Sequence, residues 1–224
     1  MPDMTTPIPA DATLDEIRLG LAPLIAANAG FDGWTGEAVA LAAEQAGVDA
    51  DVAALAFNDG PVAMIDAWFA HVDAVMVAAL PAEALAERKI RARIAEQVEA
   101  RLAELAPHRD ALRRAVAILA MPQNLARATR LGWRSVDLMW RQAGDTATDY
   151  NHYTKRAILG SVYAATITVF LNDESDDWAD TRAFLARRIE GIMRFEKAKA
   201  GFVARTENLP SLSRFIGRLR YPVV

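Results

Sequence analysis

The chemistry available to this sequence is limited by its three histidines and its lack of cysteine. No cysteine occurs in the 224 residues, which excludes thiolate nucleophiles, disulfides, iron–sulfur clusters and cysteine-ligated zinc. His71, His108 and His152 lie far apart in sequence, and none belongs to an HExxH motif. Asp149 with His152 is one imperfect half of the Glu-x-x-His pairs that a di-iron bundle needs twice. We therefore predict no catalytic residue, no cofactor and no metal site, and keep a metal enzyme only as an alternative that bound iron would reveal.

The elements that position any functional side chain are predicted to be helices throughout, in an all-α fold. An apolar fraction of 53% is sufficient for a continuous core, and the long segments follow a helical period without sustained strand alternation. Glycines and prolines fall mostly between these segments. The segment 82–106 has many charges and a narrow apolar stripe, so it is expected to be one solvated connecting helix. The other long helices are expected at about 11–28, 36–46, 61–80, 107–121, 122–142, 148–171 and 178–199. A short helix through Phe57, capped by Asp49 or Asp51, is expected between the second and third of these.

Charge is distributed unevenly along the chain. The 69 residues from Leu19 to Glu87 hold ten acidic residues and no Lys or Arg, whereas Arg187 to Val224 holds nine basic residues and three acidic ones. The acidic part contains AEQAGVDADVAALAF, which predicts the helix-turn-helix of many DNA-binding repressors. DNA affinity comes largely from Lys and Arg that neutralise phosphates. We therefore predict a degenerate helix-turn-helix that does not bind nucleic acid.

The C-terminal sequence SLSRFIGRLRYPVV predicts a short amphipathic helix after a flexible arm. Aromatic and aliphatic residues on one side and arginines on the others suit the headgroup boundary of an anionic membrane. The alternative is a terminal helix that packs its apolar stripe on the core and leaves its arginines in water. The residues predicted to bind the membrane are Leu212, Arg214, Phe215, Ile216, Arg218 and Leu219.

Two stretches of the chain resemble the coenzyme Q biosynthesis protein 9 family. Residues 144–190, GDTATDYNHYTKRAILGSVYAATITVFLNDESDDWADTRAFLARRIE, resemble its signature region, and GWTGEAVALAAEQAG at 33–47 is similar to its N-terminal region. The resemblance implies a TetR-like fold, homodimerisation through the last long helices, an apolar lipid pocket, a membrane-binding terminal helix and no enzymatic activity. It also implies a role in ubiquinone biosynthesis, through binding an isoprenoid quinone intermediate or phospholipid and docking demethoxyubiquinone hydroxylase or a similar monooxygenase.

The resemblance also implies which residues dock the partner. They are Asp149, His152, Tyr153 and Arg156. Position 152 departs from the family, whose better-known members have Trp there, and loss of an aromatic anchor changes the energetics of an interface. The structural alternative for Asp149 and Arg156 is a pairing between neighbours on one helix.

The lipid chain is predicted to lie between the segments 122–142 and 148–171, where the apolar pattern and the resemblance agree. Small residues in the second segment are expected to leave space, although ordinary core packing is the alternative for every position. The predicted lining residues are Leu131, Val136, Met139, Trp140, Ile158, Gly160, Ser161, Val162, Ala165 and Val169. Met121, Leu125 and Ala128 are second choices.

The predicted organisation has four parts. They are a flexible leader (1–10), the degenerate helix-turn-helix region (11–80), lipid-binding and dimerisation helices (81–200), and the arm with the membrane helix (201–224). Because the leader lacks the basic residues of a signal or transit peptide, we expect a bacterial protein, peripheral on the cytoplasmic face of the inner membrane. The expected function is a lipid-binding accessory protein that presents a quinone intermediate to a hydroxylase. The alternative is a TetR-type ligand-responsive transcription regulator.

Overall fold

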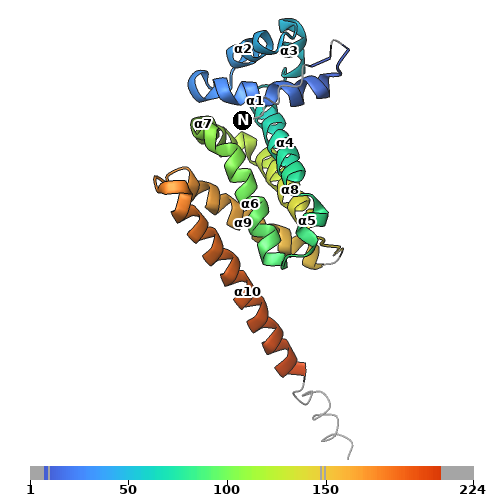
Figure 1. The fold of residues 1–224 in the computed structure, drawn as a ribbon, viewed down its shortest axis with the longest axis vertical. Coiled ribbons are helices and arrows are strands. Elements are labelled where there is room, and N and C mark those ends of the chain that lie inside the picture. Colours follow the sequence, from blue (N-terminus) through green and yellow to red (C-terminus); the bar gives the residue numbers. More distant parts are fainter. Residues whose placement is uncertain (1–7, 10, 147, 149, 208–224) are drawn as a thin grey trace, which may run out of the picture. The chain divides into compact units, whose positions relative to one another are not determined.

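A computed structural model of the chain describes residues 8, 9, 11–146, 148 and 150–207. Every regular element in this part of the chain is a helix, which confirms the predicted all-α class (Figure 1). The chain divides after Leu185 into two compact units; the elements described below lie in the first, except that α10 begins in the first and continues into the second. The α-helices are α1 (Leu14–Asp32), α2 (Gly36–Ala46), α3 (Ala50–Ala56), α4 (Pro61–Ala79), α5 (Ala82–Ala86), α6 (Ile90–Leu105), α7 (Arg109–Leu119), α8 (Leu125–Gln142), α9 (Tyr150–Phe170) and α10 (Ala179–Glu207). Short 3₁₀ turns cover Ala106–His108, Pro122–Asn124 and Asp176–Trp178.

The predicted helix-turn-helix is formed by α2 and α3. The hydroxyl of Thr35 caps α2, and Asp49 caps α3 by accepting hydrogen bonds from the amides of Asp51 and Val52. Between the helices Gly47 adopts a left-handed conformation with φ of 68°, which glycine takes without steric cost. On the outside α3 carries Val52 and Leu55, both exposed. Asp49 and Asp51 lie at its start, and Arg18 of α1 donates to the carbonyl of Ala56 at its end.

Helix α4 forms the centre of the first unit. It packs against α1, α6, α7 and α8, and Trp68 is buried with its ring centroid 5.3 Å from that of Trp34. The indole of Trp34 donates a hydrogen bond to the carbonyl of Ala111 at 3.0 Å, which ties α7 to the same core. By length and composition α4 qualifies as a candidate membrane span, the one found among the described residues, but here its apolar side chains pack against neighbouring helices.

The prediction of a single solvated helix over residues 82–106 is wrong in two respects. The helix is interrupted at residues 87–89, where the guanidinium of Arg93 donates to the carbonyls of Ala86 and Arg88 at 2.6 and 2.8 Å. These bonds satisfy carbonyls that a continuous helix would have used. The later part, α6, packs on α4, and its Arg101 is buried with 1% of its surface exposed. Charge alone did not identify this residue as part of the core.

The predicted end of the last long helix, at about residue 199, differs from the structure. α10 continues to Glu207, so the first residues of the range predicted as an arm are helical. Residues 208–224, which include all six residues predicted to bind the membrane, lie outside the described residues, as do residues 1–7 and 10 of the predicted leader.

The turn between α9 and α10 is built around the buried carboxylate of Asp173. It accepts hydrogen bonds from the amide and hydroxyl of Ser175 at 2.8 and 2.5 Å, and from the amide and hydroxyl of Thr181 at the same two distances. Burial opposes ionisation of Asp173, but these four bonds outweigh it and hold its pKa far below the usual range. Arg109 of α7 donates to the Asp173 carbonyl at 2.7 Å.

Asp173→Asn is expected to lower the free energy of unfolding by about 2 kcal/mol at neutral pH, the cost of weakening hydrogen bonds to a charged group. Because the folded pKa is depressed, this stabilisation is fully present above the unfolded pKa of about 4 and is lost progressively as pH falls from there through the much lower folded pKa. Urea unfolding should therefore show a smaller difference between wild type and variant near pH 3. Glu174→Gln, at an exposed neighbour, is the control and should change little. A difference that is equal at both pH values would contradict this role.

Candidate functional site

An aromatic patch, made of Trp133, His152 and Tyr153, joins α8 to α9. The ring centroid of Trp133 lies 6.4 Å from that of His152 and 6.1 Å from that of Tyr153, and the last two are 5.1 Å apart. Tyr153 is 62% exposed, whereas Trp133 and His152 are half-buried. The structure thus brings two predicted docking residues together and adds Trp133, which the sequence interpretation did not include.

Beneath the aromatic patch lies an ionic clamp, made of Arg156, Lys155, Asp137 and Asp145. The guanidinium of Arg156 donates to Asp137 at 2.6 Å, to Asp145 at 3.1 Å and to the carbonyl of His152 at 3.1 Å. Lys155 donates to the other oxygen of Asp145 at 2.7 Å. Only 2% of Arg156 is exposed. The clamp therefore fixes the start of α9 on α8 and on the residues between them.

The electrostatics of the clamp favour ionised carboxylates. Partial burial opposes ionisation of Asp137 and Asp145, but the hydrogen bond from Arg156 to the first and those from Lys155 and Arg156 to the second lower both pKa values. Arg141 also pairs with Asp137. The predicted docking role of Arg156 stays a prediction, and any such role would act through the residues it holds. Asp149 lies outside the described residues.

The residues predicted to line a lipid chain fall into three groups by burial. Leu131, Val136, Met139 and Val162 are buried, whereas Trp140, Ile158, Gly160, Ala165 and Val169 are half-buried and Ser161 is exposed. At Gly160 an added Cβ would lie 4.0 Å from a methyl of Val136, so the two helices approach closely there. The indole of Trp140 donates to the carbonyl of Lys155 at 3.1 Å, which links this set to the clamp. Their role in lipid binding stays a prediction.

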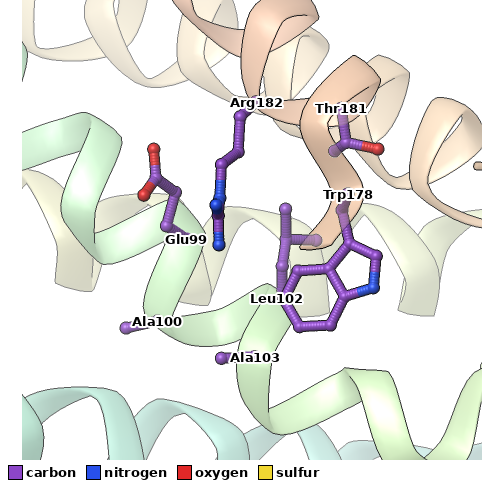
Figure 2. A pocket seen from close by; sticks show the side chains of 7 residues that line it. All are labelled: Glu99, Ala100, Leu102, Ala103, Trp178, Thr181 and Arg182. Carbon is purple, nitrogen blue, oxygen red and sulfur yellow. The ribbon is translucent and has the colours of Figure 1, made fainter. Parts of the chain in front are cut away.

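Two surface pockets occur elsewhere in the first unit. One of about 260 Å³ is lined by α6 and the beginning of α10, and Figure 2 shows Arg182 extending between Glu99 and Trp178. A second, of about 320 Å³, lies between α1, α4 and α8 and has the Arg134–Asp66 ion pair at its edge. None of the residues predicted to line a lipid chain lines either pocket. Charged edges of this kind do not suit an isoprenoid chain.

A buried polar cluster links four helices and was not anticipated from the sequence. Arg101 of α6 forms an ion pair with Asp73 of α4 and donates to the hydroxyl of Tyr163 on α9 at 2.9 Å. Ser135 of α8 donates to the second oxygen of Asp73 at 3.1 Å. Both charged side chains are at least 93% buried, which makes this cluster part of the core.

Two of the three histidines, His71 and His108, share Glu104 as a charged neighbour. His71 lies 3.4 Å from Glu104, and burial lowers the pKa of His108, which packs near Trp68. Within the described ranges, no group of three or more His, Asp or Glu side chains is arranged to hold a metal ion. His152 belongs to the aromatic patch.

Comparisons with known proteins identify the region that holds these features. The COQ9 family model matches residues 125–196, which include the aromatic patch and the whole clamp. Ubiquinone biosynthesis protein COQ9, mitochondrial, is 36% identical over 170 residues in Rattus norvegicus and 33% identical over 168 residues in Homo sapiens. Each alignment covers 72% of this chain and 54% or 52% of the relative, so the chain spans about half the length of these relatives.

The fold has a counterpart among solved structures. A TetR transcriptional regulator from Nitrosomonas europaea superposes with a TM-score of 0.60 at 21% sequence identity. The superposition covers 79% of this chain and 96% of the regulator. The predicted TetR-like architecture is confirmed.

Proposed function

The chain belongs to the COQ9 family, and on this premise we propose that it is a lipid-binding accessory protein of ubiquinone biosynthesis. It takes a quinone intermediate from an anionic membrane and presents it to demethoxyubiquinone hydroxylase or a similar monooxygenase, without catalysing a reaction itself. The observation that carries the proposal is the aromatic patch held on the clamp, inside the segment that the family model matches.

The aromatic patch suits partner docking on physical grounds. Exposed aromatic side chains on a rigid support are the usual energetic centres of protein interfaces, and Tyr153 is such a residue. The clamp holds the backbone of His152 directly, so the patch loses little conformational freedom when a partner binds. Trp133 supplies an indole next to His152, the position where the sequence departs from the family.

Lipid binding and dimerisation are assigned to the long helices after α7. Buried apolar residues of α8 and α9 provide a surface for an isoprenoid chain or a phospholipid chain. The exposed small residues Ser161, Ala164 and Thr168 of α9 allow a helix of a second copy to approach closely. The basic amphipathic terminal segment is assigned to the membrane surface. The protein would then be peripheral on a membrane, and its bacterial origin stays a prediction.

Transcriptional regulation is the alternative that the TetR-like fold suggests. The helix that would enter the major groove, α3, carries Val52 and Leu55 on its exposed surface and Asp49 and Asp51 at its start. Since phosphate contacts need Lys or Arg, this surface opposes DNA binding. A gel shift at low salt with genomic DNA fragments would reveal a regulator. We expect no DNA band of reduced mobility.

Tyr153→Ala is expected to raise the Kd for the hydroxylase by about 30-fold, the effect of removing a hot-spot aromatic worth about 2 kcal/mol. Trp133→Ala should weaken binding in the same direction. The matched control is Phe31→Ala, because Phe31 is a 90% exposed aromatic on α1, away from the patch. Binding of purified hydroxylase by calorimetry gives the comparison. An unchanged Kd for Tyr153→Ala would remove the aromatic patch from the proposal.

The lipid part of the proposal has a separate test. Native mass spectrometry of the protein purified from a ubiquinone-making host should show an isoprenoid or phospholipid bound to a dimer. A folded dimer without bound lipid would indicate that the predicted lining residues are ordinary core residues, and docking would remain as the main function.

A further inference from the structure

The segment that contains α7, the turn at Pro122–Asn124 and the first half of α8 has a charge pattern opposite to that of α1–α4. Between Asp110 and Asp137 the chain holds no acidic residue. In the same interval it holds five arginines: Arg113, Arg114, Arg127, Arg130 and Arg134. This part of the surface therefore attracts anions, whereas α2 and α3 repel them.

Three large apolar side chains are exposed around the turn in this segment. Val116 is 36% exposed, Met121 43% and Leu125 53%. The turn itself is fixed by two hydrogen bonds from Asn124. Its side-chain amide donates to the carbonyl of Ile118 at 2.8 Å, and its backbone amide donates to the carbonyl of Met121 at 2.8 Å. The apolar side chains are thus held at the surface by an ordered backbone.

Two of the arginines are free to bind an external anion. In the part of the chain that the structure describes, Arg127 and Arg130 are exposed and make no hydrogen bond or ion pair. They lie three residues apart on α8, and so on one side of the helix, just after Leu125. By contrast, Arg113 donates to the carbonyl of Leu171 at 2.5 Å and Arg134 pairs with Asp66.

We propose that the basic corner, defined as Val116, Met121, Leu125, Arg127 and Arg130, is a second membrane-contact surface that binds an anionic bilayer. Exposed aliphatic side chains at the turn, followed within the next two turns of α8 by unpaired arginines, match the order of acyl chains and anionic headgroups at a membrane boundary. Charge complementarity selects this occupant, since two arginines that are unpaired in the described part of the chain, in a segment without acidic residues between Asp110 and Asp137, match anionic headgroups. The inference rests on the proposed function and adds a surface that the terminal segment does not supply.

The position of the basic corner gives it a role in lipid transfer. Leu125 begins α8, and Trp133 follows eight residues later, about 12 Å along the helix at 1.5 Å per residue. A bilayer bound at the corner would therefore lie one helix segment from the aromatic patch and from the apolar residues shared by α8 and α9. A lipid leaving that bilayer would reach the docking surface over a short path.

The test is vesicle co-sedimentation of the full chain with phosphatidylcholine vesicles, with and without phosphatidylglycerol. Replacing both free arginines (Arg127→Gln with Arg130→Gln) should lower binding to the anionic vesicles by about 30-fold, because each basic residue contributes about 1 kcal/mol. Met121→Gln with Leu125→Gln should also reduce binding. The matched control is Lys89→Gln with Arg91→Gln, which removes the same charge from two exposed side chains at the start of α6 that form no hydrogen bond or ion pair within the described residues. Circular dichroism verifies that each variant is folded.

The outcomes separate this inference from the proposed function. Loss of binding in the corner variants but not in the control supports the inference. The corner variants could bind vesicles as well as the control does, while Phe215→Asp with Leu219→Asp abolishes binding. The proposed role of the basic corner would then be wrong, and membrane attachment by the terminal segment would stand. If the corner variants keep vesicle binding but lose dimerisation or hydroxylase binding, the corner is a protein interface and the inference is overturned. Failure of the wild type to bind any vesicle would contradict the proposed membrane function itself.

Discussion

Replacing Arg101 with Met is expected to lower the free energy of unfolding by about 3–5 kcal/mol, the cost of leaving one partner of a buried ion pair uncompensated. In the wild type the guanidinium pairs with Asp73 and donates to Tyr163. After the change, Asp73 keeps the hydroxyl of Ser135 and a more distant Arg134, whose Nε lies 3.6 Å away. Neither replaces a direct charge partner in the core, so the folded state is destabilised.

The design separates loss of charge pairing from loss of packing. Asp73→Leu with Arg101→Met removes both charges and should recover much of the stability, because buried pairs are often replaceable by apolar side chains of similar volume. Arg91→Met removes an exposed arginine from the same helix and should change the free energy by less than about 0.5 kcal/mol. Urea unfolding at one protein concentration provides the values, since the proposed dimerisation would make stability concentration-dependent. An Arg101→Met variant as stable as Arg91→Met would show that the pair does not stabilise the core.

The elements of the fold were predictable from local signals. Thr35, Gly47 and Asp49 bracket α2 and α3 because a cap or a left-handed glycine acts within a few residues of its own position. The break between α5 and α6 was missed because no cap residue or glycine marks it. The carbonyls that it exposes are instead satisfied by the side chain of Arg93, which donates to the carbonyl of Arg88. The sequence pattern assigned Arg101 to solvent because its partners lie 28 and 62 residues away. Burial of a charge is decided by such distant partners.

The candidate site was predictable only in part, and for the same reason. The family resemblance indicated His152 and Tyr153, which the structure places in one aromatic patch. Trp133 was missed because its contact with Tyr153 depends on how α8 packs against α9. The spacing of residues along a single helix does not predict such a contact. Arg156 was predicted to dock the partner, with a pairing to a helical neighbour as the alternative. Its docking role stays a prediction, but its carboxylate partners lie 19 and 11 residues earlier in the chain and not on the same helix.

Arg156→Met is expected to lower the free energy of unfolding by about 3 kcal/mol and to weaken hydroxylase binding as well. This loss is at the low end of the about 3–5 kcal/mol typical of a broken buried ion pair. The reason is that Asp137 keeps Arg141 as a charge partner and Asp145 keeps Lys155. Loss of the bond to the His152 carbonyl frees the start of α9, and the aromatic patch then loses its fixed support. Lys155→Met is the matched control, since this partly exposed pair should contribute about 1 kcal/mol or less.

Two further measurements distinguish a positioning role of Arg156 from direct contact with the partner. Hydrogen exchange should accelerate in Arg156→Met at the amide of Asp145, which donates to the carbonyl of Trp140 at 3.0 Å, and should not change in Tyr153→Ala. Arg156→Lys keeps the charge but not the forked geometry, so it should recover part of the stability and part of the binding together. If Arg156→Met weakened docking while exchange and stability stayed at wild-type values, the clamp would not position the patch. Tyr153→Ala should instead weaken docking alone, because its ring is exposed and the clamp below it remains intact.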